Sequence, residues 1–263
     1  MLKKLLSVFL LLLVCAGVLA GCGNDKPAEK QQVRIAAAAS LEKVFTEKLI
    51  PMFNQKYPDI KIEGTYDSSG KLQTQIEQGL AADIFVSAAT KQMQALTNKG
   101  YMDEQKTVPL LENKLVLIVP SASDKKAGTF TDIADAAQPA IGDPKSVPAG
   151  QYAKEALEKL GLWQQVSSKA SLGTNVTEVL HWVAEGSADA GIVYATDAAD
   201  SDKVKIVAEA PAGVLAKPVI YPMGILKQAP HAQAAAKFYN FLRSKEAAEV
   251  FEAAGFAVVK QEQ

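Results

Sequence analysis

The sequence predicts an α/β fold, because short apolar runs typical of buried strands alternate with segments of helical spacing. Strand-like runs occupy Val33–Ala38, Ile60–Thr65 and Ile84–Val86, and helical periodicity occupies Leu41–Tyr57 and Thr90–Asn98. Such alternation indicates mostly parallel sheets flanked by helices. About 230 residues of this kind fit either one domain or two lobes.

The alternation continues to the carboxyl end of the chain. Further strands are predicted at Leu115–Val119, Ala140–Gly142, Ala190–Val193, Lys205–Val207 and Val219–Leu226, and further helices at Lys71–Gln78, Ala149–Leu160, Val176–Glu185 and, as a pair, within Ala232–Ala254. Pro51 interrupts the pattern of Leu41–Tyr57, so we expect two helices or a kink there.

The first residues have the pattern of an export signal. Lys3 and Lys4 precede an apolar run, and small residues follow it up to Leu19-Ala20-Gly21-Cys22. This is typical of a secretory signal peptide, predicted at residues 1–21. Leu19-Ala20-Gly21-Cys22 resembles the lipobox of bacterial lipoproteins, in which the cysteine is acylated. Cys22 is therefore the expected lipid anchor. Residues 22–31 are polar and read as a flexible tether.

Composition excludes several classes of function. From Cys22 to Gln263 the chain has 26 basic and 29 acidic side chains, a balance that suggests no nucleic-acid partner. No cysteine follows Cys22, which excludes disulfides, thiolate metal sites and a cysteine nucleophile there. Any bound anion must therefore be held by local geometry rather than by a broadly positive surface.

Four junctions in the predicted fold share one feature, since small residues lead directly into the start of a helix. They are Ala37-Ala38-Ala39-Ser40-Leu41, Asp67-Ser68-Ser69-Gly70-Lys71, Val147-Pro148-Ala149-Gly150 after Gly142-Asp143-Pro144, and Gly173-Thr174-Asn175-Val176. The first N–H groups of a helix have no partner within it and attract anions. Several such helix starts, aimed at one point, would form an anion site without lysine or arginine.

Each junction also has a structural interpretation. Ser40 and Ser69 are suitable N-caps, Asn175 with Glu178 fits a capping box, and Pro148 favours a helix start. Asp83 could be a catalytic carboxylate, although a buried cap or turn role is the safer interpretation. Singly the junctions are structural, and together they favour a binding site.

Other classes of protein have little support. A secreted hydrolase using Ser40 or Ser69 needs a histidine nearby, and the histidines His181 and His231 stand in no hydrolase motif. A module for organic acids would normally use an arginine clamp. The arginines, Arg34 and Arg243, lie at none of the four junctions.

The chain resembles the molybdate-binding proteins of ABC transporters. The resemblance runs from about Val33 to the carboxyl end and rests on the motifs Ala37–Leu41, Ala82–Ala88, Gly142–Gly161 and Gly191–Tyr194 in that order, of which Gly142–Gly161 is the most specific. It implies a type II periplasmic-binding-protein fold, in which two lobes close on a tetrahedral oxyanion. We expect lobe one at residues 32–112 and 221–263 and lobe two at 113–220, with the hinge at Glu112-Asn113 and near Ile220-Tyr221.

The resemblance also implies the site. The family's binding positions fall on Ser40, Ser69, Ala149, Val176 and Tyr194. All five would donate hydrogen bonds and none would accept, which suits fully deprotonated molybdate, tungstate or sulfate and disfavours hydrogen phosphate, whose proton would lack an acceptor. Gly70-Lys71 departs from the family's pattern, and we expect Lys71 to point to solvent.

These expectations define a monomeric, extracytoplasmic lipoprotein, in the periplasm or on the outer face of the cell membrane, that needs no cofactor and is not an enzyme. It would pass molybdate or tungstate to the permease of an ABC transporter. The nearest alternative is the same fold binding sulfate or another tetrahedral oxyanion.

Overall fold

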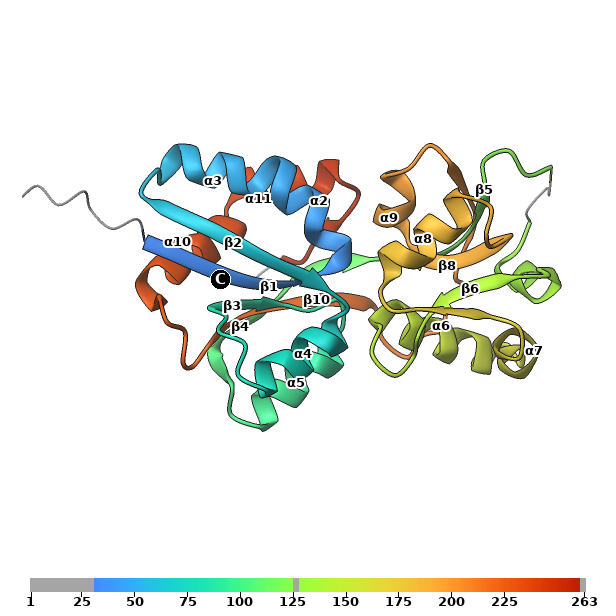
Figure 1. Cartoon of the computed structure of the whole chain (residues 1–263), viewed down its shortest axis with the longest axis horizontal. Helices are drawn as coiled ribbons and strands as arrows, with labels where there is room; N and C mark the ends of the chain where they lie inside the picture. Colours follow the sequence, from blue (N-terminus) through green and yellow to red (C-terminus); the bar gives the residue numbers. More distant parts are fainter. Residues whose placement is uncertain (1–30, 125–127, 261–263) are drawn as a thin grey trace, which may run out of the picture. The chain divides into compact units, whose positions relative to one another are not determined.

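The computed structural model describes residues 31–124 and 128–260. These residues form two β-sheets flanked by helices, so the predicted α/β fold is confirmed (Figure 1). The predicted signal peptide and lipidated Cys22 lie outside the described residues, as does the tether up to residue 30. Gln31, which we assigned to the tether, is instead the first residue of β1.

The first sheet has six strands in the spatial order β11-β4-β10-β3-β1-β2. Their bounds are β1 (Gln31–Ala38), β2 (Ile60–Asp67), β3 (Ile84–Val86), β4 (Met102–Asn113), β10 (Val219–Leu226) and β11 (Ala257–Val258). β1 pairs in parallel with β2 and β3, whereas β10 runs antiparallel to β3 and β4. We call the part built on this sheet lobe one.

The second sheet has five strands in the order β7-β6-β8-β5-β9. Their bounds are β5 (Leu115–Pro120), β6 (Pro139–Gly142), β7 (Ser171–Gly173), β8 (Ala190–Tyr194) and β9 (Val204–Glu209). β6 pairs in parallel with β7 and β8, and β5 runs antiparallel to β8 and β9. We call the part built on this sheet lobe two.

Both sheets are mixed, so the expectation of mostly parallel sheets is wrong in this detail. Parallel pairing is confined to β1, β2 and β3 in lobe one and to β6, β7 and β8 in lobe two. The antiparallel strands β4, β5, β9 and β10 carry the chain between the lobes. It leaves sheet one after Asn113 and returns at Val219, where these two residues pair with each other.

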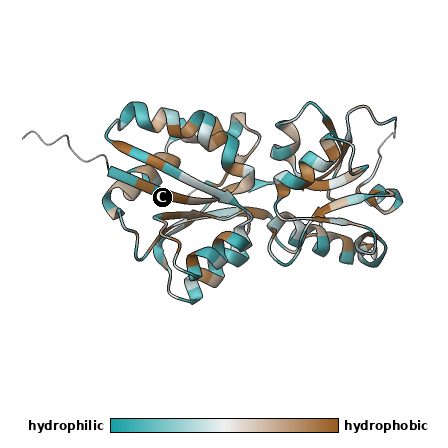
Figure 2. Ribbon diagram, viewed as in Figure 1, coloured by the Kyte–Doolittle hydropathy of each residue, from teal (hydrophilic) through white to brown (hydrophobic). Residues whose placement is uncertain are grey.

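Helices cover both faces of sheet one (Figure 1). α4 (Ser69–Glu77) and α5 (Thr90–Asn98) pack on one face, and α3 (Ile50–Lys56), α10 (Ala232–Leu242) and α11 (Lys245–Ala253) lie on the other. Phenylalanine rings fill the space beneath α3 and α10, with the Phe53 and Phe238 centroids 4.9 Å apart. Figure 2 shows the apolar residues gathered in the strands and on the inward sides of the helices.

The predicted disturbance at Pro51 is a change of helix type. The chain runs through a 3₁₀ turn (Ala39–Leu41), α2 (Glu42–Val44) and a π-helical segment (Phe45–Leu49) into α3. Pro51 lies in the first turn of α3, directly after the π-helical segment. Proline has no N–H to donate, and a wider helical turn before it avoids the clash with the preceding carbonyls.

Lobe two contains α6 (Pro148–Lys159), α7 (Trp163–Ser167), α8 (Val176–Ala184), α9 (Ala195–Ala199) and a 3₁₀ segment (Phe130–Asp135). α6 and α8 bury apolar side chains against sheet two, among them Leu157 and Val179. Both helices begin where β6 and β7 end, which places their amino termini at the carboxyl edge of the sheet. Among the described residues, no helix is long and apolar enough to cross a membrane.

Candidate functional site

Ser40 and Ser69 are both buried at the start of helical segments. Ser40 lies in the 3₁₀ turn after β1, and its Oγ is 2.9 Å from the hydroxyl of Tyr221. Ser69 is the first residue of α4 and fully buried, and its Oγ accepts a hydrogen bond of 2.9 Å from the backbone N–H of Ala88. Neither serine is an N-cap, so the structural interpretation of these two residues is wrong.

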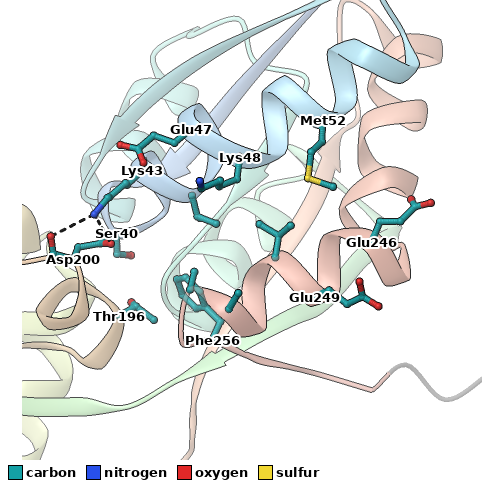
Figure 3. A pocket seen from close by; sticks show the side chains of 14 residues that line it. Ser40, Lys43, Glu47, Lys48, Met52, Thr196, Asp200, Glu246, Glu249 and Phe256 are labelled. Atoms are coloured by element: carbon teal, nitrogen blue, oxygen red, sulfur yellow. Dashed lines mark hydrogen bonds and ion pairs between the residues drawn. The ribbon is translucent and has the colours of Figure 1, made fainter.

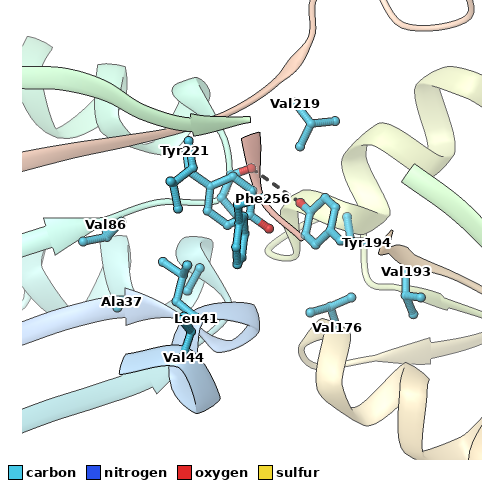
Figure 4. Close-up of a cluster of buried hydrophobic side chains, with 14 of the residues drawn as sticks. Ala37, Leu41, Val44, Val86, Val176, Val193, Tyr194, Val219, Tyr221 and Phe256 are labelled. Atoms are coloured by element: carbon cyan, nitrogen blue, oxygen red, sulfur yellow. Dashed lines mark hydrogen bonds between the residues drawn. The ribbon is translucent and has the colours of Figure 1, made fainter. Parts of the chain in front are cut away.

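Tyr194, a residue of lobe two, contacts the same neighbours as Ser40 and Ser69 do. It is the last residue of β8, and its hydroxyl lies 3.4 Å from the carbonyl oxygen of Ala88, the residue that also contacts Ser69. Its ring faces that of Tyr221 with centroids 5.6 Å apart, and the two phenols are hydrogen-bonded (Figure 4). Ser40, Ser69 and Tyr194 are therefore connected through Ala88 and Tyr221.

Ala149 and Val176 stand at the starts of α6 and α8. Pro148 opens α6, as predicted, and Val176 is the first residue of α8. A Cβ added at Gly150 would lie 1.9 Å from the carbonyl oxygen of Gly142, so only glycine lets the first turn of α6 approach β6 this closely. In Figure 4, Val176 lies beside Tyr194.

The capping of these helices differs. α8 is capped by Asn175, whose Oδ1 accepts from the N–H of Glu178, and the carboxylate of Glu178 accepts from Thr174 rather than from Asn175. The predicted cap is confirmed, in a variant form of the capping box. In contrast, α4 and α6 begin without any side-chain cap. A helix start normally needs such a partner, so the first N–H groups of these two helices, apart from that of Gly70, are candidate donors to a ligand.

Direct contacts join the two lobes around these helix starts. The N–H of Gly70 donates to the carbonyl oxygen of Ser146 over 2.9 Å, which links α4 to the loop before α6. Gln92 of α5 donates to Gln151 of α6 over 3.1 Å. On the other side of Ser40, Lys43 and Asp200 form an ion pair of 2.9 Å. The five predicted residues thus lie where the lobes meet.

Burial keeps the phenols protonated. It raises the pKa of both Tyr194 and Tyr221 well above the usual value, and it raises that of nearby Tyr152 to about 12. Each phenol therefore keeps a proton to donate at neutral pH. Lys71 does not simply point to solvent, since it pairs with Asp67 over 3.2 Å and is only partly exposed.

A cavity of about 540 Å³ opens beside Ser40, but it does not suit an anion (Figure 3). Its walls come from the helical stretch after β1 and from α9 and α11, and include Met52 and Phe256. The charged residues that line it are more acidic than basic, which disfavours an oxyanion; the acidic ones are Glu47, Asp200, Glu246 and Glu249, and the basic ones are Lys43 and Lys48. Ser69, Ala149, Val176 and Tyr194 are not among its lining residues. The helix starts, rather than this cavity, are therefore the candidate anion site.

The residues required by a hydrolase are separated from the serines. His231 lies against Asp83, with Nδ1 3.1 Å from a carboxylate oxygen, and Asp83 also accepts from the backbone N–H groups of Arg34 and His231. Asp83 is therefore a buried acceptor that joins segments distant in the chain, rather than the local cap or turn residue that the sequence suggested. Ser40 and Ser69 have Tyr221 and Ala88 as partners instead. Across residues 31–124 and 128–260, no group of three potential metal ligands is found.

Two residues at the candidate site were predicted only as hinge positions. The hydroxyl of Tyr221 contacts Ser40, and Asn113 Nδ2 reaches that hydroxyl at 3.3 Å and Thr196 Oγ1 at 2.9 Å. Both Asn113 and Tyr221 are buried. Asn113 ends β4, a strand with a polar first half, and Tyr221 lies near the start of β10, so no local sequence signal identified their contact.

Two α/β lobes joined by two chain crossings, with helix starts meeting between them, define a solute-binding protein rather than an enzyme. The chain belongs to the family of bacterial extracellular solute-binding proteins, whose model matches residues 33–257. This confirms the resemblance found in the sequence.

The relatives agree with this assignment. YvgL of Bacillus subtilis, described provisionally as an ABC transporter substrate-binding lipoprotein, is 40% identical over 96% of this chain and 98% of its own. The molybdate-binding protein ModA of Escherichia coli is 36% identical over 88% and 91% of the two chains. The periplasmic molybdate-binding protein of Azotobacter vinelandii has the same fold, with a TM-score of 0.77, 20% identity, and coverage of 87% of this chain and all of its own.

Proposed function

We propose that this protein captures molybdate or tungstate outside the cytoplasm and delivers it to the permease of an ABC transporter. The observation that carries the proposal is the meeting of the uncapped starts of α4 and α6 with the hydroxyls of Ser40, Ser69 and Tyr194. An anion placed there would receive hydrogen bonds from both lobes.

The proposed hydrogen-bond donors of the site favour an anion that carries no proton. Ser40, Ser69 and Tyr194 would give hydroxyl protons, and Ala149 and Val176 would give backbone N–H groups. A dianion without protons accepts all of them, whereas hydrogen phosphate brings a proton that needs an acceptor. Each charge-assisted hydrogen bond contributes about 1.5–3 kcal/mol, so several can hold an anion without a buried cation. Discrimination between molybdate and sulfate would then depend on cavity size.

The relatives support the ligand and the location. ModA of Escherichia coli is named for molybdate, and YvgL is described as a lipoprotein. Acylation of Cys22 would attach this chain to the outer face of the cell membrane, with residues 23–30 as the tether. The protein would act there as a monomer.

Closure of the lobes would report ligand binding to the permease. The chain crosses between the lobes at Asn113-Lys114 and before Val219, and bending at these two crossings would open the site. We expected lobe one at residues 32–112 and 221–263 and lobe two at 113–220; in this proposal lobe one also takes the ends of its strands, Gln31, Asn113, Val219 and Ile220.

Isothermal titration of the 24–263 fragment with molybdate, tungstate, sulfate and phosphate tests the proposal. Tight one-to-one binding of molybdate or tungstate, with little response to phosphate, is the expected result. Equal binding of sulfate would shift the function to general oxyanion capture. Binding of none of the four would contradict the proposed ligand class.

A further inference from the structure

Behind Ser40 and Tyr194 lies a second layer of polar groups that the five binding positions do not include. We propose that Asn113 and Tyr221 are positioning residues, which direct the hydroxyl proton of either Ser40 or Tyr194 toward the bound anion. This inference rests on the proposed function, because it concerns how the same site selects a fully deprotonated oxyanion.

The hydroxyl of Tyr221 is the centre of this layer. It is fully buried and lies 2.9 Å from Ser40 Oγ and 3.3 Å from Asn113 Nδ2, and it is hydrogen-bonded to the phenol of Tyr194. Two of these three neighbours are predicted ligand donors. The third, Asn113, is the last residue of β4, where the chain leaves lobe one.

The orientation of the Asn113 amide is fixed by its other contacts. Its Oδ1 accepts a hydrogen bond of 2.8 Å from the N–H of Lys114, so the oxygen must face that group. Its Nδ2 therefore faces Tyr221 and Thr196, and each of its two protons has an acceptor. Toward Tyr221, Asn113 can only donate.

The number of protons and lone pairs on the Tyr221 hydroxyl then determines which of its neighbours donate to it and which accept from it. The phenol has one proton to give and accepts at its lone pairs. Asn113 already donates to one lone pair, so the proton of Tyr221 must go to Ser40 or Tyr194. Whichever of them receives it has an occupied lone pair and can give its own proton to the anion, which for Tyr194 would replace the long contact of 3.4 Å with the carbonyl oxygen of Ala88.

An acceptor at position 113 would reverse this arrangement. Tyr221 would donate to it, and its lone pairs would attract the protons of Ser40 and Tyr194 away from the ligand. The site would then present oxygen lone pairs to a dianion, which is unfavourable. Asn113→Asp makes this change with little alteration of side-chain volume, because an ionised carboxylate only accepts.

The test is isothermal titration of molybdate into wild type, Asn113→Asp, Tyr221→Phe and the double variant, between about pH 6 and pH 8.5. Burial raises the pKa of a carboxyl group, and a protonated carboxyl can donate as the Asn amide does. At the highest pH we expect Asn113→Asp to bind molybdate at least about tenfold more weakly than wild type does. As the pH falls, its affinity should return toward that of wild type. Each affinity is expressed relative to wild type at the same pH, because Asp197, whose pKa burial raises to about 7, titrates in this range in all the variants. Tyr221→Phe should weaken binding less, and by a factor that does not change with pH.

The double variant separates this network from charge repulsion. Without the Tyr221 hydroxyl, a carboxylate at position 113 cannot redirect Ser40 or Tyr194, so most of its pH-dependent effect should disappear. Persistence of the full effect in the Tyr221→Phe background would overturn the inference, as would wild-type affinity in Asn113→Asp throughout. Asn54→Asp, at an exposed position of α3, is the matched control and should bind as wild type does. No binding by wild type would overturn both proposals, whereas failure of the variants alone would overturn only this one.

Discussion

The backbone N–H of Gly70 donates a 2.9 Å hydrogen bond to the carbonyl oxygen of Ser146, and this contact joins lobe one to lobe two beside the candidate site. A Cβ at position 70 would lie 2.3 Å from that oxygen and 2.7 Å from the Cα of Ser146. Glycine at this position is therefore explained by the close approach of two backbones.

Gly70→Ala should weaken anion binding, because the added methyl group prevents the approach of the lobes that the contact requires. We expect a loss of affinity of about tenfold or more, with little change in the unfolding free energy of the ligand-free protein. Titration and denaturant unfolding measure the two quantities. Gly128→Ala is the control, since a Cβ there meets nothing nearer than 4.0 Å. Equal affinities of the two variants would contradict a role of the Gly70 contact in closure.

Ser69→Ala should weaken oxyanion binding more than Lys71→Ala does. The serine change removes a proposed donor and leaves the N–H of Ala88 without its acceptor, so about 1–3 kcal/mol of stability should be lost as well. Lys71 forms a partly exposed pair with Asp67, which contributes at most about 1 kcal/mol. Titration with molybdate compares the two variants, and wild-type affinity in Ser69→Ala would show that the site is placed wrongly.

The sequence predicted the elements whose pattern is local and regular. Ile84–Val86, Thr90–Asn98 and Val219–Leu226 were predicted with the bounds that the structure has. β4 was missed because its first half, Asp103–Lys106, is polar and lacks the apolar alternation of a strand. It is ordered by pairing with β10, which is distant in the chain, and no local pattern reports such pairing.

The candidate site was predictable in part for the same reason. Helix starts have local signals, so the junctions at Ser40, Ser69, Ala149 and Val176 could be identified from the residues around them. The polar layer behind these helix starts could not be identified in this way. Asn113 and Tyr221 are 108 positions apart, and their hydrogen bond follows from the mixed sheet that was expected to be mostly parallel.

Asp83→Ala should destabilise the protein without changing anion affinity. The carboxylate is fully buried and accepts from the backbone N–H groups of Arg34 and His231, each over 2.7 Å. Its loss leaves two partly buried donors without this acceptor, so we expect about 2–5 kcal/mol of destabilisation. Denaturant unfolding and titration of the folded variant measure the two effects. Weaker binding by the folded variant would indicate that Asp83 contributes to the site.

Cys22→Ser should release the protein from the membrane, because a serine cannot carry the thioether-linked lipid. Fractionation of cells that express the full-length chain should place wild type with the membranes and the variant in the soluble extracytoplasmic fraction. Cys15→Ser lies within the predicted signal peptide and is the matched control, with wild-type behaviour expected. Membrane retention of Cys22→Ser would contradict the lipid anchor and leave the binding function untouched.

Asp197→Asn should make the ligand-free protein more stable above neutral pH. Burial raises the pKa of Asp197 from 3.8 to about 7, so the folded state binds this proton more tightly than the unfolded state does. The stability that Asp197 contributes is therefore complete below about pH 4 and is lost as the pH rises to about 7. The Asn variant stays neutral and can still accept from the N–H of Tyr194, which donates to Asp197 over 3.1 Å.

The difference in unfolding free energy between Asp197→Asn and wild type should therefore grow between about pH 4 and pH 7 and then level off. A shift of about three pKa units corresponds to roughly 4 kcal/mol as an upper bound. Urea unfolding at a series of pH values measures this difference, with Asp59→Asn at an exposed position as the control. A difference independent of pH would mean that Asp197 is ionised throughout, held by the first turn of α9 and the N–H of Tyr194 in spite of its burial.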